Sequence, residues 1–91
     1  MNLRRAARSQ RCQIRLPLIC NGDETTTVLA HFRIIGVSGL GMKSPDLIGA
    51  HACSACHEYC DTHRDAETQL AFARGVFRTQ AALISRGVLK L

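Results

Sequence analysis

Three cysteines and three histidines fall within thirteen residues, in the stretch HACSACHEYCDTH from His51 to His63. Thiolates and imidazoles are the side chains that bind zinc most readily in proteins. A chain of 91 residues buries only about 60 to 65% of its unfolded surface. A small core of this kind benefits from an additional cross-link. The cluster therefore predicts a small domain held together by a metal ion.

Length and composition favour a single domain over residues 1–91. The core is expected to be thin, because the chain has no Trp, one Tyr and three Phe. No apolar run is long enough for a secretory signal or a membrane span. We therefore expect a cytoplasmic protein, with no membrane as partner. In that reducing compartment, clustered cysteines indicate metal ligands rather than disulfides.

Positive charge is concentrated at the amino terminus. Five arginines precede the first acid, Asp23, whereas residues 23–91 hold seven basic and seven acidic side chains. The whole formal excess of +5 thus comes from the start of the chain, and we call residues 1–11 the basic N-terminal arm. Such an arm suits a polyanion, because each neutralised phosphate releases counterions. It is equally typical of a solvated terminus that keeps a protein soluble.

The segments before the cluster predict short strands and loops. Residues 12–22 read as a loop-rich element, and residues 25–36 are β-branched and suit one or two short strands. Residues 36–46 contain glycines and a proline, which favours a loop long enough to be functional.

Helical patterns begin at Cys53. Two neighbouring stripes of the first helix carry its polar and thiol side chains: Cys56, Cys60 and His63 on one, and His57, Asp61 and Arg64 on the other. One short helix could therefore serve two sites. A second helix is predicted from about Asp65 to Arg86, ending at Gly87. Its core-facing side is predicted to carry Leu70, Ala73, Phe77 and Ile84. The tail VLKL is expected to add a strand or to dock.

Two sets of zinc ligands fit the cysteines. Zinc commonly takes two close pairs from separate loops. The first set joins Cys53 and Cys56, a C-x-x-C pair, to Cys12 and Cys20. A rival set is local and uses Cys53, Cys56, Cys60 and His63, but three ligands on one helical stripe enclose an ion poorly. The first set is favoured, and it leaves Cys60 as a small buried residue.

Two other uses of the C-x-x-C pair are disfavoured. CSACH matches the pattern for covalent haem attachment. That chemistry requires export machinery, and we expect no secretory signal in this chain. In addition, the internal methionine, Met42, lies before the motif and not after it. A redox-active pair would follow the hydrophobic strand of a βαβ unit, and CSAC does not.

The order of motifs carries a resemblance to a known class. His31 ends the strand-like VLAHFR, and a glycine-rich loop, PDL and a C-x-x-C-H helix follow. This order resembles the HNH, or ββα-metal, endonucleases. Several blocks spread over nearly the whole chain are similar to the YbcO family of small prophage-encoded nucleases, which is related to the phage recombination-enhancing nuclease Ref: LRRAARSQRCQIRLP, CNG, VLAHFR, GLGMKSPDLI, ACSACH and RTQ.

The resemblance implies an α+β fold, a small zinc-stapled ββα-metal domain with an additional C-terminal helix. It implies hydrolysis of a DNA phosphodiester, with His31 as the general base. A divalent cation such as Mg²⁺ would be held or oriented by His57 and Asp61. Arg33 would grip a phosphate oxygen. Asp46 takes the middle position of the motif, where it could orient His31, reach the metal, or serve only as the turn residue after Pro45.

Some positions depart from the HNH pattern. Many HNH enzymes carry a metal ligand directly before the base, and here that position is Ala30. This departure supports an alternative, a non-catalytic zinc-binding module that binds DNA or a recombination protein. His51 and His63 have no counterpart in the motif, and His51 is interpreted as a surface residue. A recombinase is a candidate partner, and the oligomeric state stays open.

Overall fold

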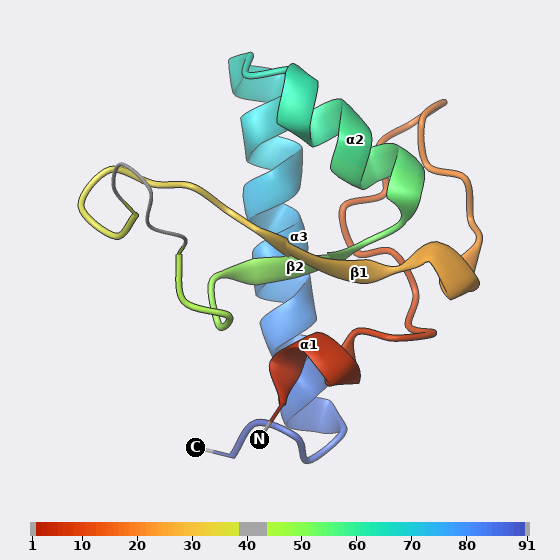
Figure 1. The fold of residues 1–91 in the computed structure, drawn as a ribbon, viewed down its shortest axis with the longest axis vertical. Helices are drawn as coiled ribbons and strands as arrows, with labels where there is room; N and C mark the ends of the chain where they lie inside the picture. The colour runs from red at the N-terminus through yellow and green to blue at the C-terminus, as the bar shows by residue number, and fades with distance from the viewer. Residues whose placement is uncertain (1, 39–43, 91) are drawn as a thin grey trace.

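The computed structural model describes residues 2–38 and 44–90, so part of the predicted loop at 36–46 lies outside the described residues. The elements follow one another as α1 (Leu3–Ala6), a 3-10 helix (Glu24–Thr26), β1 (Val28–His31), β2 (Gly49–Ala52), α2 (Ser54–Thr62) and α3 (Ala66–Ser85). This order confirms the α+β class. Figure 1 shows the β1–β2 ribbon at the centre, with α3 running behind it and α2 across one end of α3.

Strands β1 and β2 pair antiparallel, with Leu29 opposite His51 and Ala30 opposite Ala50. Strand β1 is shorter than the predicted range. Asp23 caps the preceding 3-10 helix, where its side chain accepts a hydrogen bond from the amide of Thr25, because Asp side chains favour such turns over strands. All four residues of β2 are buried and three of them are Gly or Ala, so neighbouring elements can approach its backbone closely.

Helix α3 has well-formed ends. The Asp65 side chain accepts hydrogen bonds from the amide and the hydroxyl of Thr68, which satisfies a free donor at the start of the helix. At the other end, Gly87 has a positive φ of 73°. The amides of Val88 and Gly87 donate to the carbonyls of Leu83 and Ile84, a Schellman motif. The predicted helix is confirmed to within one residue at each end, and the tail after it docks without a strand up to residue 90.

The predicted core-facing side of α3 is wrong. Leu70 and Phe77 are 51% and 69% exposed, and Ile84 is also exposed. The buried side instead carries Thr68, Phe72, Gly75, Val76, Thr79 and Leu83. Small side chains face inward because α3 lies directly against backbone: a Cβ on Gly75 would come within 2.9 Å of an Ile14 side-chain carbon.

The amino-terminal residues pack on the body of the protein. Leu3 and Ala7 are buried, and the Arg86 guanidinium donates to the carbonyl of Ala6 at 2.9 Å. In Figure 1, α1 lies against the carboxyl-terminal part of α3, close to the position of this hydrogen bond. Among the described residues, no helix combines the length and apolar character needed to cross a membrane.

Candidate functional site

The first feature is a cluster of four cysteines from separate parts of the chain. The sulfurs of Cys12, Cys20, Cys53 and Cys56 all lie within 4.8 Å of one another. Cys12 and Cys20 come from the amino-terminal loop, Cys53 is the N-cap of α2, and Cys56 lies in its first turn. All five cysteines are free thiols. Three of the four clustered cysteines are buried, and Cys20 is partly exposed.

The cluster fits a tetrahedral metal ion. Zinc–sulfur bonds of about 2.3 Å place tetrahedral sulfurs about 3.8 Å apart, and the Cys53 and Cys20 sulfurs are 3.8 Å apart. Backbone amides support two sulfurs, since the amide of Arg15 donates to Cys12 and that of Cys56 to Cys53. Four such cysteines could hold a metal such as zinc. Within residues 2–38 and 44–90 no other group of three or more ligands is close enough to do so.

Thiol pKa values in the cluster diverge. A hydrogen bond from Cys56 lowers the pKa of Cys12 to about 4, although burial opposes this shift. The same contact, together with burial, raises the pKa of Cys56. One sulfur in the cluster therefore already favours the thiolate form that binds a metal.

The rival ligand set is not assembled. Cys60 is buried at 2% exposure, as predicted for a residue outside the site, and burial raises its pKa to about 11. His63 is exposed, and its ring stacks on Tyr59 with centroids 3.7 Å apart. Its Nδ1 lies 3.0 Å from the carbonyl oxygen of Tyr59. His63 therefore points away from the cysteine cluster.

The second feature is an open cleft of about 460 Å³ between α1, β1 and α2. It is lined by Arg4, Arg8, Thr27, Val28, Leu29, His31, Arg33, Ser44, His57 and Asp61. The cleft thus brings His31 from the end of β1 together with His57 and Asp61 from α2, and with three arginines. Its walls are rich in positive charge and in groups that exchange protons or bind cations.

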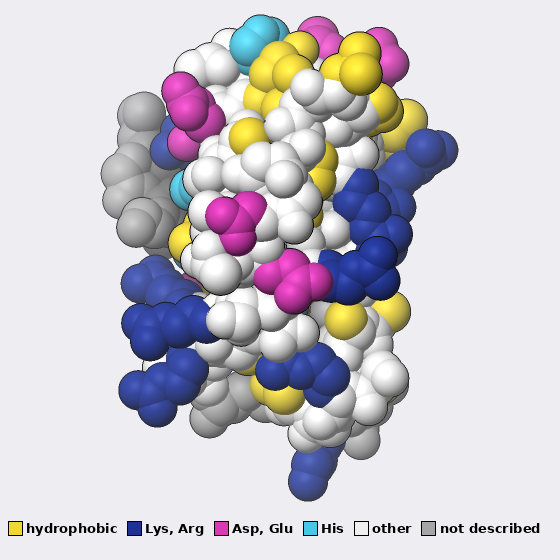
Figure 2. All heavy atoms as spheres, turned by 90° about the vertical axis from the view of Figure 1, so that its right-hand side faces the viewer, with side chains coloured by type: hydrophobic (Ala, Val, Ile, Leu, Met, Phe, Trp, Pro, Cys, Tyr) yellow, Lys and Arg dark blue, Asp and Glu magenta, His cyan; other side chains and the backbone are white. Residues whose placement is uncertain are grey.

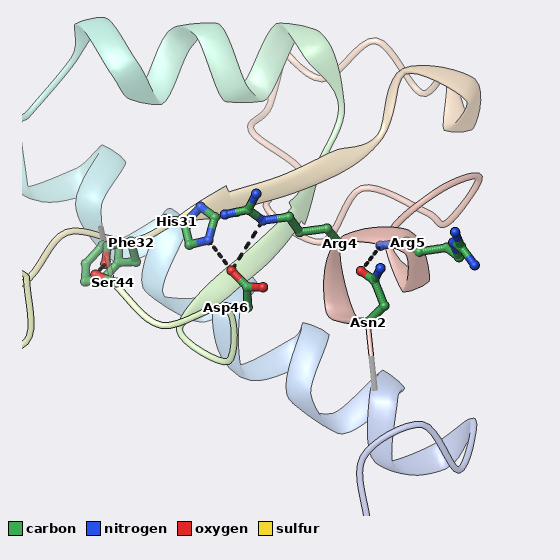
Figure 3. A network of polar contacts seen from close by, with 7 residues as sticks. All are labelled: Asn2, Arg4, Arg5, His31, Phe32, Ser44 and Asp46. Atoms are coloured by element: carbon green, nitrogen blue, oxygen red, sulfur yellow. Dashed lines mark hydrogen bonds and ion pairs between the residues drawn. The ribbon is translucent and has the colours of Figure 1, made fainter. Parts of the chain in front are cut away.

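A polar network orders the His31 ring (Figure 3). Nε2 of His31 lies 2.7 Å from Oδ1 of Asp46, and Nε of Arg4 lies 3.5 Å from the same oxygen. The hydrogen bond from His31 and the charge of Arg4 hold the pKa of Asp46 below its ordinary value. An ionised Asp46 accepts a hydrogen bond from Nε2–H, so the second ring nitrogen of a neutral His31, Nδ1, keeps its lone pair.

His57 and Asp61 are one helical turn apart on α2, with Nε2 of His57 3.8 Å from Oδ2 of Asp61. Both side chains are accessible from the cleft. This pair lies on the side of α2 away from Cys56 and Cys60, which are buried. The two predicted stripes of the helix thus have different surroundings. Cys56 and Cys60 of the first stripe are buried, but its third member, His63, is exposed. His57 and Asp61 of the second stripe line the cleft.

Sequence reasoning missed three features. It gave Arg4 no specific place, although Arg4 contacts Asp46; the contact joins residues forty-two positions apart, and no local spacing signals it. Ser44 is buried in the cleft wall, where its hydroxyl donates to the carbonyl of Phe32. His51 was interpreted as a surface residue, but it is buried at 1% exposure, because both faces of β2 are covered.

The fold and site together define a class: a small α+β protein with a cluster of four cysteines that could hold a metal ion, beside a basic cleft lined by histidine and aspartate. The chain belongs to the YbcO family, whose model is described as "Putative nuclease YbcO" and matches residues 1–88. "Putative nuclease YbcO" of Escherichia coli K12 is 45% identical over 94 aligned residues, covering 98% of this chain and 97% of the relative. The protein of the same name from Enterobacteria phage 82 matches equally well.

A solved structure agrees with the fold. The chain titled "Structure of a putative bacteriophage protein from Escherichia coli str. K-12 substr. MG1655" aligns with a TM-score of 0.77 at 40% identity, over 94% of this chain and all of that one. The family assignment supports a nuclease function for this chain.

Proposed function

We propose that this protein is a metal-dependent DNA endonuclease of the HNH type. One observation carries the proposal: the His31 ring is hydrogen-bonded to Asp46 in a cleft that also contains His57, Asp61 and arginines. The chain order β1, long connection, β2, α2 supports an HNH-like arrangement. Arginine-lined walls favour a phosphate-rich substrate, and the relative from a phage supports a role in phage recombination or DNA processing.

In this proposal His31 is the general base. Asp46 is ionised and accepts a hydrogen bond from Nε2–H of His31, so Nδ1 takes a proton from water as the water oxygen attacks phosphorus. The bond from phosphorus to the leaving oxygen then breaks. Asp46 orients the ring and stabilises its protonated form, in the role that a carboxylate plays beside a catalytic imidazole. Arg4 keeps Asp46 in place.

His57 and Asp61 would hold a divalent cation, for which Mg²⁺ is our first candidate in the cell. Their Nε2 and Oδ2 atoms lie 3.8 Å apart in the cleft, and Mg²⁺ typically uses one or two protein ligands together with water and substrate phosphate. When bound, such an ion neutralises charge on the phosphate and the leaving oxygen. Arg33, with Arg4 and Arg8, would contact neighbouring phosphates and fix the position of the strand.

The test is conversion of supercoiled plasmid to nicked or linear DNA with added Mg²⁺ or Mn²⁺. His31→Ala is expected to lower the cleavage rate by about 10²- to 10⁴-fold, the usual contribution of a general base. Asp46→Asn should reduce it less, because the base remains. The matched control is His63→Ala, which removes an exposed imidazole outside the cleft and should leave the rate unchanged. If His31→Ala protein cleaves as fast as the parent, the catalytic assignment is wrong.

A second candidate is a zinc-stapled module that binds DNA or a recombination protein without cleaving. The observation that favours it is Ala30, which is buried at 1% exposure where many HNH enzymes carry a metal ligand. This candidate predicts salt-sensitive DNA binding and no product strands with any divalent metal. Assays with and without a recombinase filament test whether such a partner is needed for cleavage.

A further inference from the structure

The two segments that cross at Gly75, residues 11–15 and α3, together carry four arginines, and Arg78 of α3 donates directly to the backbone of the other segment. A Cβ on Gly75 would lie 3.1 Å from the Cα of Ile14 and 3.2 Å from the carbonyl oxygen of Gln13. The missing side chain of Gly75 therefore allows the segment around residues 13–14 to lie directly on the helix. This contact brings together basic residues about sixty positions apart in sequence, which we call the rear basic patch: Arg11, Arg15, Arg74 and Arg78.

Hydrogen bonds fix two of these side chains at the crossing. Nε of Arg78 donates to the carbonyl of Gln13 at 2.9 Å, and its Nη2 to that of Ile14 at 3.4 Å. Nε of Arg15 donates to the carbonyl of Cys12 at 3.1 Å. Arg74 lies one helical turn before Arg78, about 6 Å along the axis. Two guanidinium groups are thus held in place before any partner arrives, which reduces the entropic cost of binding.

The patch is not neutralised by the protein itself. Across the described ranges, the carboxylate ion pairs involve Arg4, His31 and His57, and none involves a member of the patch. Arg11 and Arg74 are exposed. Arginine forks match phosphate oxygens in pairs, and a surface of positive charge alone suits the evenly repeated charges of a phosphate backbone.

The patch is separate from the cleft. The cleft is lined by residues of β1, α2 and the α1 region, whereas the patch lies on α3, which runs behind the β1–β2 ribbon in Figure 1. Figure 2 shows Lys and Arg side chains along both edges of the molecule, with acidic side chains between them. The molecule measures 19 Å across its shortest dimension. The cleft and the rear basic patch are therefore two surfaces of one thin molecule.

We propose that the rear basic patch binds the phosphate backbone of a second DNA segment, so that one molecule can hold two duplexes, one in the cleft and one against α3. The proposal rests on the proposed function for the identity of the first duplex. It adds that the protein joins two DNA segments and does not need catalysis to do so.

The experiment is a capture assay without added divalent cation, so that no DNA is cut. A biotinylated 30-base-pair duplex on beads is incubated with protein and a fluorescent duplex of unrelated sequence, and the captured fluorescence is measured. The parent protein should capture the second duplex. Arg11→Glu with Arg74→Glu should reduce capture at least tenfold, since neither side chain makes a hydrogen bond within the described residues and the fold should persist. Lys90→Glu, with the same charge change per site, is the control and should capture normally.

Two further variants separate this proposal from the function. Arg33→Glu in the cleft should also reduce capture, and it should slow plasmid cleavage, whereas the Arg11/Arg74 variant should cleave a single plasmid at the parental rate. Absence of cleavage by the parent, with capture intact, would overturn the function and leave the second surface. Capture by the Arg11/Arg74 variant equal to the parent, or no capture by the parent at all, would overturn the second surface, whatever the cleavage result.

Discussion

Helices α2 and α3 are oriented by different forces. Helix α2 buries Cys56 and Cys60 on one side and presents His57 and Asp61 to the cleft on the other. Helix α3 buries Thr68, Gly75 and Thr79 alongside Phe72, Val76 and Leu83, and it leaves two other bulky side chains, Leu70 and Phe77, exposed. The position of the first helix brings Cys53 and Cys56 to the sulfurs of Cys12 and Cys20. The second is fixed by the shape of the surface on which it packs, a strand of small residues and the crossing segment.

The largest effect is expected from removing a ligand on the buried side of α2. Cys56→Ser should abolish stoichiometric zinc binding and folding, because a structural zinc contributes about 10 to 16 kcal/mol and a whole domain is stable by only about 5 to 15 kcal/mol. Elemental analysis and thermal unfolding of the purified variant measure both. Retention of one zinc per chain by Cys56→Ser protein would show that the cluster is not the metal site.

Cys60→Ala is the matched control for that experiment. Cys60 is buried on the same helix, one turn after Cys56, but it lies outside the four-sulfur cluster. This variant should keep its zinc and lose only the packing of one sulfur. If both variants lost metal, the result would favour the rival ligand set that includes Cys60.

The next effect compares two phenylalanines of α3. Phe72 is 7% exposed and packs edge-to-face on Phe32 with ring centroids 5.0 Å apart. Phe72→Ala should therefore lower the free energy of unfolding by about 3 to 5 kcal/mol. Phe77 is 69% exposed, and Phe77→Ala should change it by less than about 0.5 kcal/mol. Urea unfolding of the two variants measures the difference, and equal losses would mean that Phe77 is covered in solution.

The cysteine cluster could be predicted from the sequence, because few residue types bind metals and the spacing between such residues is short. The C-x-x-C pair at Cys53 and Cys56 indicated half of the cluster, and the preference of zinc for two close pairs from separate loops indicated Cys12 and Cys20 as the other half. The N-cap Asp65 and the stop at Gly87 similarly predicted the ends of α3. These signals are local, and each depends on the chemistry of one or two residues.

The buried face of α3 could not be predicted from the sequence. Hydrophobic periodicity indicates where bulky apolar residues repeat, but it does not indicate how closely the neighbouring surface approaches the helix. Here the partner is β2 and the backbone of residues 13–14, and close approach selects Gly75 and Thr79 over larger residues. The Thr79 hydroxyl accepts a hydrogen bond from the amide of His51 at 2.9 Å, a contact that no hydrophobic pattern contains. The Arg4–Asp46 contact could not be predicted either, because the two residues are far apart in the sequence.

The smallest effect concerns pH and the same α3–β2 contact. His51 is buried, neither ring nitrogen has a hydrogen-bond partner among the residues described, and burial, together with the charge of Arg86, lowers its pKa. A histidine whose pKa is lower in the folded state binds more protons when unfolded. Stability from this group is therefore complete above its ordinary pKa of about 6.5 and is lost as the pH falls below that value.

Between pH 7 and pH 5, the parent should accordingly lose more unfolding free energy than His51→Leu protein, because only the parent has an imidazole at this position that takes up a proton on unfolding. Release of metal by acid affects both proteins equally, because both retain the four cysteines, so it cancels in the difference. Parallel pH profiles for the parent and His51→Leu would mean that His51 binds protons equally well in the folded and unfolded states, so that its burial against α3 does not oppose its protonation.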